Sequence, residues 1–155
     1  MREGRIDDAV ERFRKVTASK DKVYGPIARV TLGQLLFKQG KTQQAIFELR
    51  KAASASPPTV TSVQAHGFLV LFLKQLGKKD EHTRARKDQL EALEGLSKRE
   101  DAEASSYGLY LLGLEHMHDG RKDVARARLE EALKRGGLAA EDLEKVKEVL
   151  SRLSA

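Results

Sequence analysis

Apolar residues return along this chain at a helical period, and glycines and prolines separate the segments in which they do so. Ala45, Leu49 and Ala52 stand at positions i, i+4 and i+7, which places them on one face of a helix. Pro57-Pro58 and Gly77 end such segments, because proline cannot continue a helix and glycine favours its C-terminal end. The pattern predicts an all-α fold with helices over about 5–19, 24–39, 42–55, 59–76, 79–97, 102–118, 121–135 and 139–154.

Parts of the chain repeat one another in register. With a constant offset of 80 positions, Leu32, Gly33, Gly40, Ala45, Leu49 and Ala52 are matched by Leu112, Gly113, Gly120, Ala125, Leu129 and Ala132. A partial copy begins the chain, where Gly4, Ala9, Phe13 and Val16 lie 36 positions before Gly40, Ala45, Leu49 and Ala52. The small residues allow two helices to cross closely. The repeated unit is therefore a helix–turn–helix whose apolar face must be buried by the next unit.

These positions resemble the tetratricopeptide repeat family, whose unit is a helical hairpin of about 34 residues. The resemblance covers 26–58 and 106–137 and part of 4–21, and the offset of 80 makes the middle unit irregular. It implies a right-handed α-solenoid of antiparallel helix pairs in a single domain over 1–155. Within it we expect a half repeat at 4–21, repeats at 24–58 and 102–137, an irregular repeat at 59–98 and a C-terminal capping helix at 139–154.

Composition and charge narrow the function without naming it. The chain is 40% hydrophobic and 34% charged, has no cysteine and has no apolar run long enough to cross a bilayer. This predicts a cytoplasmic protein without disulfides, and the abundant Ala, Arg, Leu and Glu point to a bacterial source. The formal charge of +6 permits an acidic partner or nucleic acid without requiring either.

Catalytic and metal-binding patterns are absent from the sequence. His116 and His118 are two positions apart, so on a helix they point to different sides and cannot share one ion. There is no glycine-rich phosphate loop and no nucleophile elbow. We therefore predict no catalytic residue, no metal and no cofactor, and the chain is not expected to be an enzyme.

A basic segment offers one alternative function. It comprises Lys74, Lys78, Lys79, Arg84, Arg86 and Lys87. A nucleic-acid site would combine such a patch with stacking aromatic residues, whereas here only Asp80, Glu81 and Asp88 are interleaved. A solvated helix face is the simpler interpretation, so nucleic-acid binding is disfavoured.

The family resemblance points to a concave groove as the binding surface, because the first helix of each repeat lines it. By register, the partner-binding positions are Val30, Gln34, Phe37, Lys38, Phe68, Phe72, Tyr107, Tyr110, Leu114 and Met117. Some family members hold a C-terminal carboxylate with Lys, Asn and Arg at such positions, but these places here have Val30, Gln34, Tyr110 and Leu114. The aromatic residues suit an apolar peptide or helix instead, unless they belong to the core.

The sequence thus predicts a non-enzymatic adaptor or scaffold that binds a partner peptide or helix in a partly aromatic groove. Two alternatives stay open: a nucleic-acid-binding module that uses the basic segment, and a structural domain that self-associates through the half repeat at 4–21. The last alternative predicts an oligomer that a charge at Ile6 or Phe13 would break. Neither the partner nor the pathway follows from the sequence.

Overall fold

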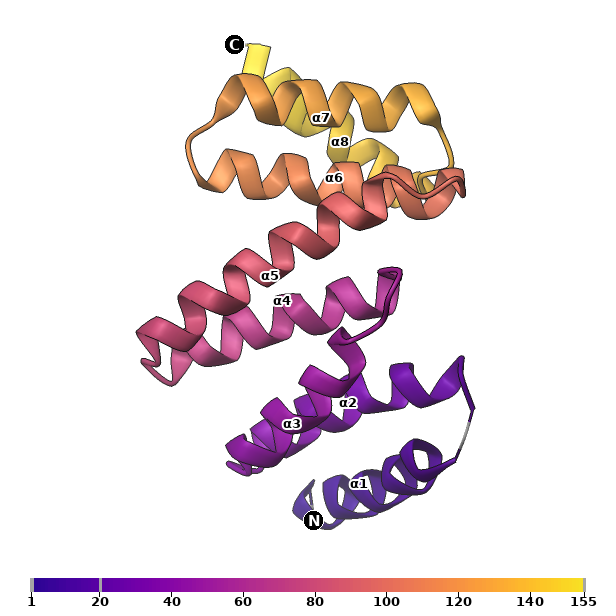
Figure 1. Cartoon of the computed structure of the whole chain (residues 1–155), viewed down its shortest axis with the longest axis vertical. Coiled ribbons are helices and arrows are strands. Elements are labelled where there is room, and N and C mark those ends of the chain that lie inside the picture. The colour runs from indigo at the N-terminus through magenta and orange to yellow at the C-terminus, as the bar shows by residue number, and fades with distance from the viewer. Residues whose placement is uncertain (1, 20, 155) are drawn as a thin grey trace. The chain divides into compact units, whose positions relative to one another are not determined.

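The fold is known from a computed structural model that describes residues 2–19 and 21–154, and every regular element in those residues is an α-helix (Figure 1). The helices are α1 (Arg2–Ala18), α2 (Tyr24–Lys38), α3 (Thr42–Ala53), α4 (Val60–Gln75), α5 (Lys79–Ser97), α6 (Ala102–His118), α7 (Lys122–Arg135) and α8 (Ala140–Ser154). The predicted all-α class is confirmed, and the helices lie within three residues of their predicted bounds. Helices that follow one another pack as pairs, consistent with a repeat-type α-solenoid.

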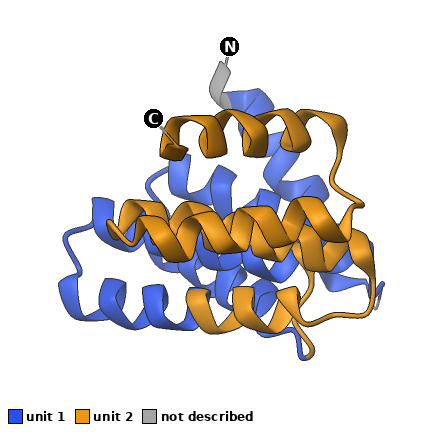
Figure 2. Ribbon diagram, turned by 90° about the horizontal axis from the view of Figure 1, so that it is seen from above, with its two compact units in different colours: residues 1–56, 61–89 blue, residues 57–60, 90–155 orange. Residues whose placement is uncertain are grey.

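The chain divides into two compact units (Figure 2). Unit 1 comprises residues 1–56 and 61–89, and unit 2 comprises residues 57–60 and 90–155. Unit 1 therefore contains α1, α2, α3 and most of α4, whereas unit 2 contains α6, α7 and α8. Each unit has a hydrophobic core of its own, so each is described separately below.

Unit 1 is organised around the close crossing of α2 and α3. A Cβ atom on Gly33 would lie 2.7 Å from Cγ of Leu49 and 3.3 Å from the backbone oxygen of Ala45, so a side chain is excluded there. Leu49 and Ala45 are fully buried. On the other side of α2, Val10 of α1 packs against Leu32 and completes this part of the core.

Unit 2 repeats this crossing with α6 and α7. A Cβ atom on Gly113 would lie 2.6 Å from Cγ of Leu129, which has no exposed surface. Gly108 makes a second close approach, because a Cβ atom there would lie 2.8 Å from the backbone nitrogen of Ser97. The glycines that the sequence placed at helix crossings therefore stand where helices touch without room for a side chain.

The offset of 80 residues extends to the helices themselves. α2 and α6 end at Lys38 and His118. α3 and α7 begin at Thr42 and Lys122, and α4 and α8 begin at Val60 and Ala140. The two residues are 80 positions apart in each case. α1 and α5 end at Ala18 and Ser97, which are 79 residues apart. The helical pattern of the first half of the chain thus recurs in the second half, and α8 occupies the sequence position that α4 has in the first half.

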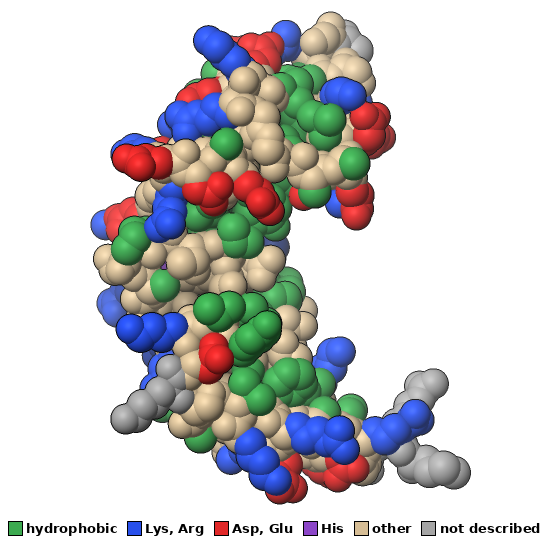
Figure 3. Space-filling view, turned by 90° about the vertical axis from the view of Figure 1, so that its right-hand side faces the viewer, with side chains coloured by type: hydrophobic (Ala, Val, Ile, Leu, Met, Phe, Trp, Pro, Cys, Tyr) green, Lys and Arg blue, Asp and Glu red, His purple; other side chains and the backbone are tan. Residues whose placement is uncertain are grey.

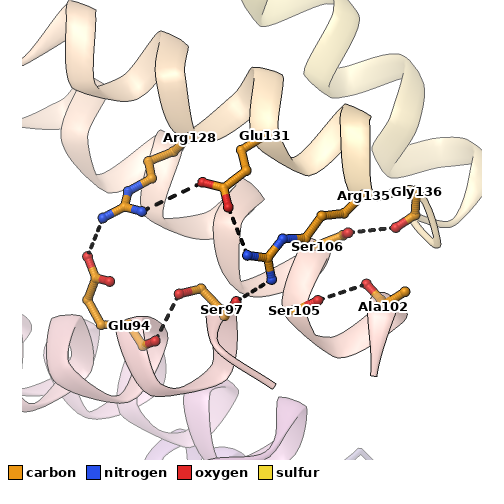
Figure 4. A network of polar contacts seen from close by, with 9 residues as sticks. All are labelled: Glu94, Ser97, Ala102, Ser105, Ser106, Arg128, Glu131, Arg135 and Gly136. Atoms are coloured by element: carbon orange, nitrogen blue, oxygen red, sulfur yellow. Dashed lines mark hydrogen bonds and ion pairs between the residues drawn. The ribbon is translucent and has the colours of Figure 1, made fainter. Parts of the chain in front are cut away.

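Polar contacts in unit 2 join the end of α5 to α7 (Figure 4). Arg128 forms an ion pair of 2.9 Å with Glu94, and Arg135 forms one of 2.8 Å with Glu131. Arg135 also donates a hydrogen bond of 2.7 Å to the backbone oxygen of Ser97. These arginines satisfy carbonyl and carboxylate groups at the helix end, where backbone acceptors lack partners within the helix.

Candidate functional site

The turn between α1 and α2 fixes the start of α2. The side chain of Asp21 accepts hydrogen bonds from the backbone N–H groups of Val23 and Tyr24, at 2.8 and 2.7 Å. Pro26 stands in the first turn of α2, where its missing N–H has no helical partner to lose. The side chain of Tyr24, the first residue of α2, is 66% exposed.

An apolar hollow lies beside this turn, between the end of α1 and the start of α2. It has a volume of about 580 Å³. Its lining residues are Phe13, Lys15, Val16, Ser19, Asp21, Tyr24, Ile27 and Ala28. Three of the apolar residues are well exposed: Tyr24 at 66%, Ile27 at 46% and Val16 at 37%. In Figure 3 hydrophobic side chains are visible near the N-terminal, lower end of the chain, with Lys and Arg around them.

The partner-binding positions predicted from the sequence include neither Tyr24 nor Val16. The pattern that could have identified Tyr24 is visible in the sequence. Tyr24 follows the Asp21 turn directly, and it begins the stripe Tyr24, Ile27, Thr31, Gln34 and Lys38, with the spacing of one helix face. Along that stripe the ends are exposed and the middle is half-buried, so α2 presents a continuous accessible face.

The predicted groove residues of unit 1 fall into two groups. Val30 and Phe72 are buried, with 6% and 7% of their surface exposed, and belong to the core of α2, α3 and α4. Phe37 and Phe68 are half-buried; the ring of Phe37 stacks on that of Phe72 at 3.7 Å, and the ring of Phe68 lies 5.9 Å from it. These aromatic residues hold α2 against α4. Of the predicted positions in this unit, Lys38 is exposed and Gln34 is half-buried.

The predicted groove residues of unit 2 pack in a cluster with α8. Tyr110 is 7% exposed and belongs to a core that includes Val146 of α8. Other partly buried residues of this cluster are Tyr107, Leu114, Met117, Val149, Leu150 and Leu153. Burial raises the pKa of Tyr110, and the nearby Asp142 adds to this effect. The aromatic positions of α6 therefore act as core residues against the last helix.

Self-association through α1 predicts that a charge at Ile6 or Phe13 breaks an oligomer. Both side chains are half-buried and pack against a core made of Val10, Leu32, Leu36 and Ala45. A charge at either position would damage unit 1 directly. The substitution thus cannot separate an interface from the fold.

The basic segment lies on α4, the following turn and α5. Glu81 accepts hydrogen bonds from Lys78 at 2.8 Å and from Arg50 at 2.9 Å, and these contacts lower the pKa of its carboxyl group. The charges of this segment are therefore partly balanced within unit 1. Among the exposed large hydrophobic residues of the described chain, no aromatic residue lies in α4 or α5, so the stacking component of a nucleic-acid site is not found there.

The two histidines of α6 lie in different environments. His116 is 7% exposed, and burial lowers its pKa, helped by Arg121 and Arg128. His118 is exposed at the helix end. Within residues 2–19 and 21–154, no group of three His, Cys, Asp or Glu side chains could hold a metal ion. In the same residues no helix has the length and apolar character needed to cross a membrane.

One comparison with known proteins matches the first part of the chain to a family. The family model described as tetratricopeptide repeat matches residues 1–58, which contain α1, α2 and α3. The resemblance inferred from the repeated small and apolar positions is thereby confirmed for this part of the chain. No curated protein matches the chain.

Proposed function

We propose that this chain, whose residues 1–58 match the tetratricopeptide repeat family, binds another protein through the apolar hollow between α1 and α2 and the accessible face of α2. Tetratricopeptide repeats generally mediate protein–protein interaction or scaffolding, and the family is typically non-enzymatic. The predicted single domain with repeats at 24–58, 59–98 and 102–137 is part of this proposal.

The observation that supports the site is the exposure of large apolar side chains around a hollow. Tyr24 and Ile27 expose 66% and 46% of their surface on consecutive turns of α2. Aromatic and aliphatic side chains that are accessible beside a pocket are typical anchors for partner residues, because they bury a large area at little conformational cost. From the hollow, a bound peptide or helix would continue along α2 past Gln34 toward Lys38.

The partner is expected to contribute large apolar side chains to the hollow. The carboxylate of Asp21 is already engaged by two backbone N–H groups, so it does not demand a cation from the partner. Lys22 is exposed next to Asp21 and would favour an acidic residue beside the apolar ones, whereas Lys15 already forms an exposed ion pair of 3.1 Å with Glu11. This chemistry fits an amphipathic peptide or helix rather than a free carboxylate terminus.

The test places a photo-crosslinking amino acid at one of two exposed aromatic positions. Position 24 lines the hollow, and position 47 on α3 is the matched control, since Phe47 is 54% exposed but does not line the hollow. Irradiation in the native cell extract should link position 24 to a discrete protein, and Tyr24→Ala together with Ile27→Ala should remove that protein from affinity capture. Equal crosslinking at both positions, or capture that survives the double substitution, would overturn the proposed site. Capture that is lost on nuclease treatment would favour the basic segment.

A further inference from the structure

A second cavity lies in unit 1 on the side of α3, α4 and α5, apart from the hollow described above. It has a volume of about 300 Å³. Its lining residues are Arg50, Ala53, Ser54, His66, Leu69, Leu73, Glu81, Arg84, Ala85 and Asp88. Three of the apolar members are buried: Leu69, Leu73 and Ala85. The cavity thus has an apolar floor and polar side chains around it, at the lower end of the size range of pockets that hold small groups.

Among the residues that line this cavity, His66 has a ring nitrogen that can accept a hydrogen bond. Its Nδ1 atom is buried and has no hydrogen-bond partner among residues 2–19 and 21–154. The backbone of Ala53 lies where it raises the pKa of His66 by hydrogen bonding, and because Nδ1 has no partner we assign the ring proton to Nε2. Burial lowers the pKa of His66, so the ring is neutral near pH 7 and Nδ1 offers a lone pair. A buried acceptor of this kind favours a group that brings one donor.

The internal repeat shows that packing alone does not require a histidine here. The residue 80 positions after His66 is Val146, which has the equivalent place in α8 and no exposed surface. An apolar side chain therefore suffices for the core at the equivalent position of the other half. The histidine in α4 adds an unpaired acceptor that the valine in α8 does not have.

The charges around the cavity favour a neutral occupant. Arg50 and Lys78 both contact Glu81, while Asp88 is close enough to raise the pKa of His66. A cation or an anion would therefore meet side chains of both signs. A flat ring would instead lie on the apolar floor and could place a face against the exposed guanidinium of Arg84.

We propose that this cavity is an anchor site for an indole or phenol ring, presented by a partner protein as a tryptophan or tyrosine side chain, whose N–H or O–H donates to Nδ1 of His66. Tryptophan and tyrosine carry one donor on a large apolar body, and both usually find a hydrogen-bond partner for it when they are buried. The site does not depend on the hollow between α1 and α2, so either proposal can fail while the other stands.

The experiment compares two probes, N-acetyltryptophanamide and its N1-methyl derivative, which lacks the indole donor. Binding is followed by NMR through the backbone signals of the lining residues and through the ring nitrogens of His66. The first probe should shift the Nδ1 signal and should bind about five-fold more tightly than the methylated probe, in keeping with one hydrogen bond. Equal affinity of the two probes, or binding that leaves the lining residues unchanged, would overturn the proposal.

Two variants separate the hydrogen bond from the extra bulk of the methyl group. His66→Leu should reduce the preference between the probes to about one-fold, because the acceptor is gone. His82→Leu is the matched control on α5, since His82 is not a lining residue, and it should retain the preference. A preference that persists in His66→Leu would mean that the cavity discriminates by size, and the proposed hydrogen bond would be wrong. If His66→Leu does not fold, the wild-type Nδ1 signal tests the hydrogen bond, because the methylated probe should not shift it.

Discussion

The helix pair α2–α3 in unit 1 and the helix pair α6–α7 in unit 2 have the same internal contact but different accessible faces. The crossing is repeated closely: Gly33 meets Leu49 and Gly113 meets Leu129, at 2.7 and 2.6 Å from a hypothetical Cβ atom. The outer positions differ, because Tyr24 is 66% exposed whereas Ala104, its counterpart 80 positions on, is 8% exposed. The crossing defines the repeat, while the positions that the crossing does not use are free to differ.

This difference explains which half of the chain has an open apolar surface. In unit 2 the partly buried aromatic and aliphatic residues of α6 pack in one cluster with α8. In unit 1 the corresponding packing with α4 uses Val30, Phe37 and Phe72, and it leaves the start of α2 accessible. A repeat array thus needs the same buried positions in each unit, but only some units need an exposed anchor.

The largest expected effect comes from removing an aromatic ring on each face. Tyr110→Ala should lower the free energy of unfolding by about 3 kcal/mol, since a large side chain is lost from a core. Tyr24→Ala should change it by less than about 0.5 kcal/mol, because its ring is mostly in solvent. Chemical denaturation monitored by circular dichroism measures both. Similar losses for the two variants would mean that the two faces do not differ as described.

The second prediction concerns the repeated crossing. Gly33→Ala and Gly113→Ala should each cost about 2 kcal/mol, because the added methyl group overlaps Leu49 or Leu129 near the middle of the side chain. Gly67→Ala is the control in the middle of α4, where a Cβ atom would have only Nε2 of Gln89 nearby, at an ordinary contact distance of 3.8 Å. It should stabilise the protein by about 0.5–1 kcal/mol through helix propensity. Thermal and denaturant unfolding would contradict the repeat if only one of the two crossings were sensitive.

The sequence was sufficient for this crossing and for the helices but not for the site. Small residues at Gly33 and Ala45 report the closeness of two helices, and their recurrence at the offset of 80 residues is visible without a structure. By contrast, Tyr24 begins α2 and Tyr110 lies in the middle of α6, although both helices are the first of a crossing pair. Whether each is covered depends on how α8, α4 and α1 pack beside them, and this long-range packing leaves no local pattern in the sequence.

A third prediction uses the histidine that replaces a leucine in the second pair. His116 lies 80 positions after Leu36, and both are buried. His116→Leu should raise the free energy of unfolding by about 1 kcal/mol at pH 7, because Nδ1 of His116 is buried without a hydrogen-bond partner among the described residues. His118→Leu, at an exposed position, is the control and should change stability little.

The gain from His116→Leu should increase in acid. Burial, Arg121 and Arg128 lower the pKa of His116 below 6.5, while Glu94 and Asp119 oppose them. The unfolded chain therefore binds a proton at a higher pH than the folded chain, so His116 destabilises the fold as the pH falls below about 6.5. Denaturation at pH 7 and pH 5 measures this. A gain for His116→Leu that is the same at both values would show that His116 titrates normally.

The smallest expected effect is at His66, where the two halves differ by a histidine and a valine. His66→Val removes an unpaired buried Nδ1 atom, which stabilises the fold, but it also removes the donor to the backbone of Ala53. These two contributions oppose each other, so the net gain at pH 7 should be below about 1 kcal/mol. Below about pH 6.5 the gain should grow, because burial lowers the pKa of His66 and the unfolded chain takes up the proton first, although Asp88 moderates the shift. Denaturant unfolding of His66→Val and wild type at pH 7 and pH 5 measures this gain. A large loss of stability at pH 7 would mean that the bond to Ala53 outweighs the unpaired atom, and that His66 is a structural residue of unit 1.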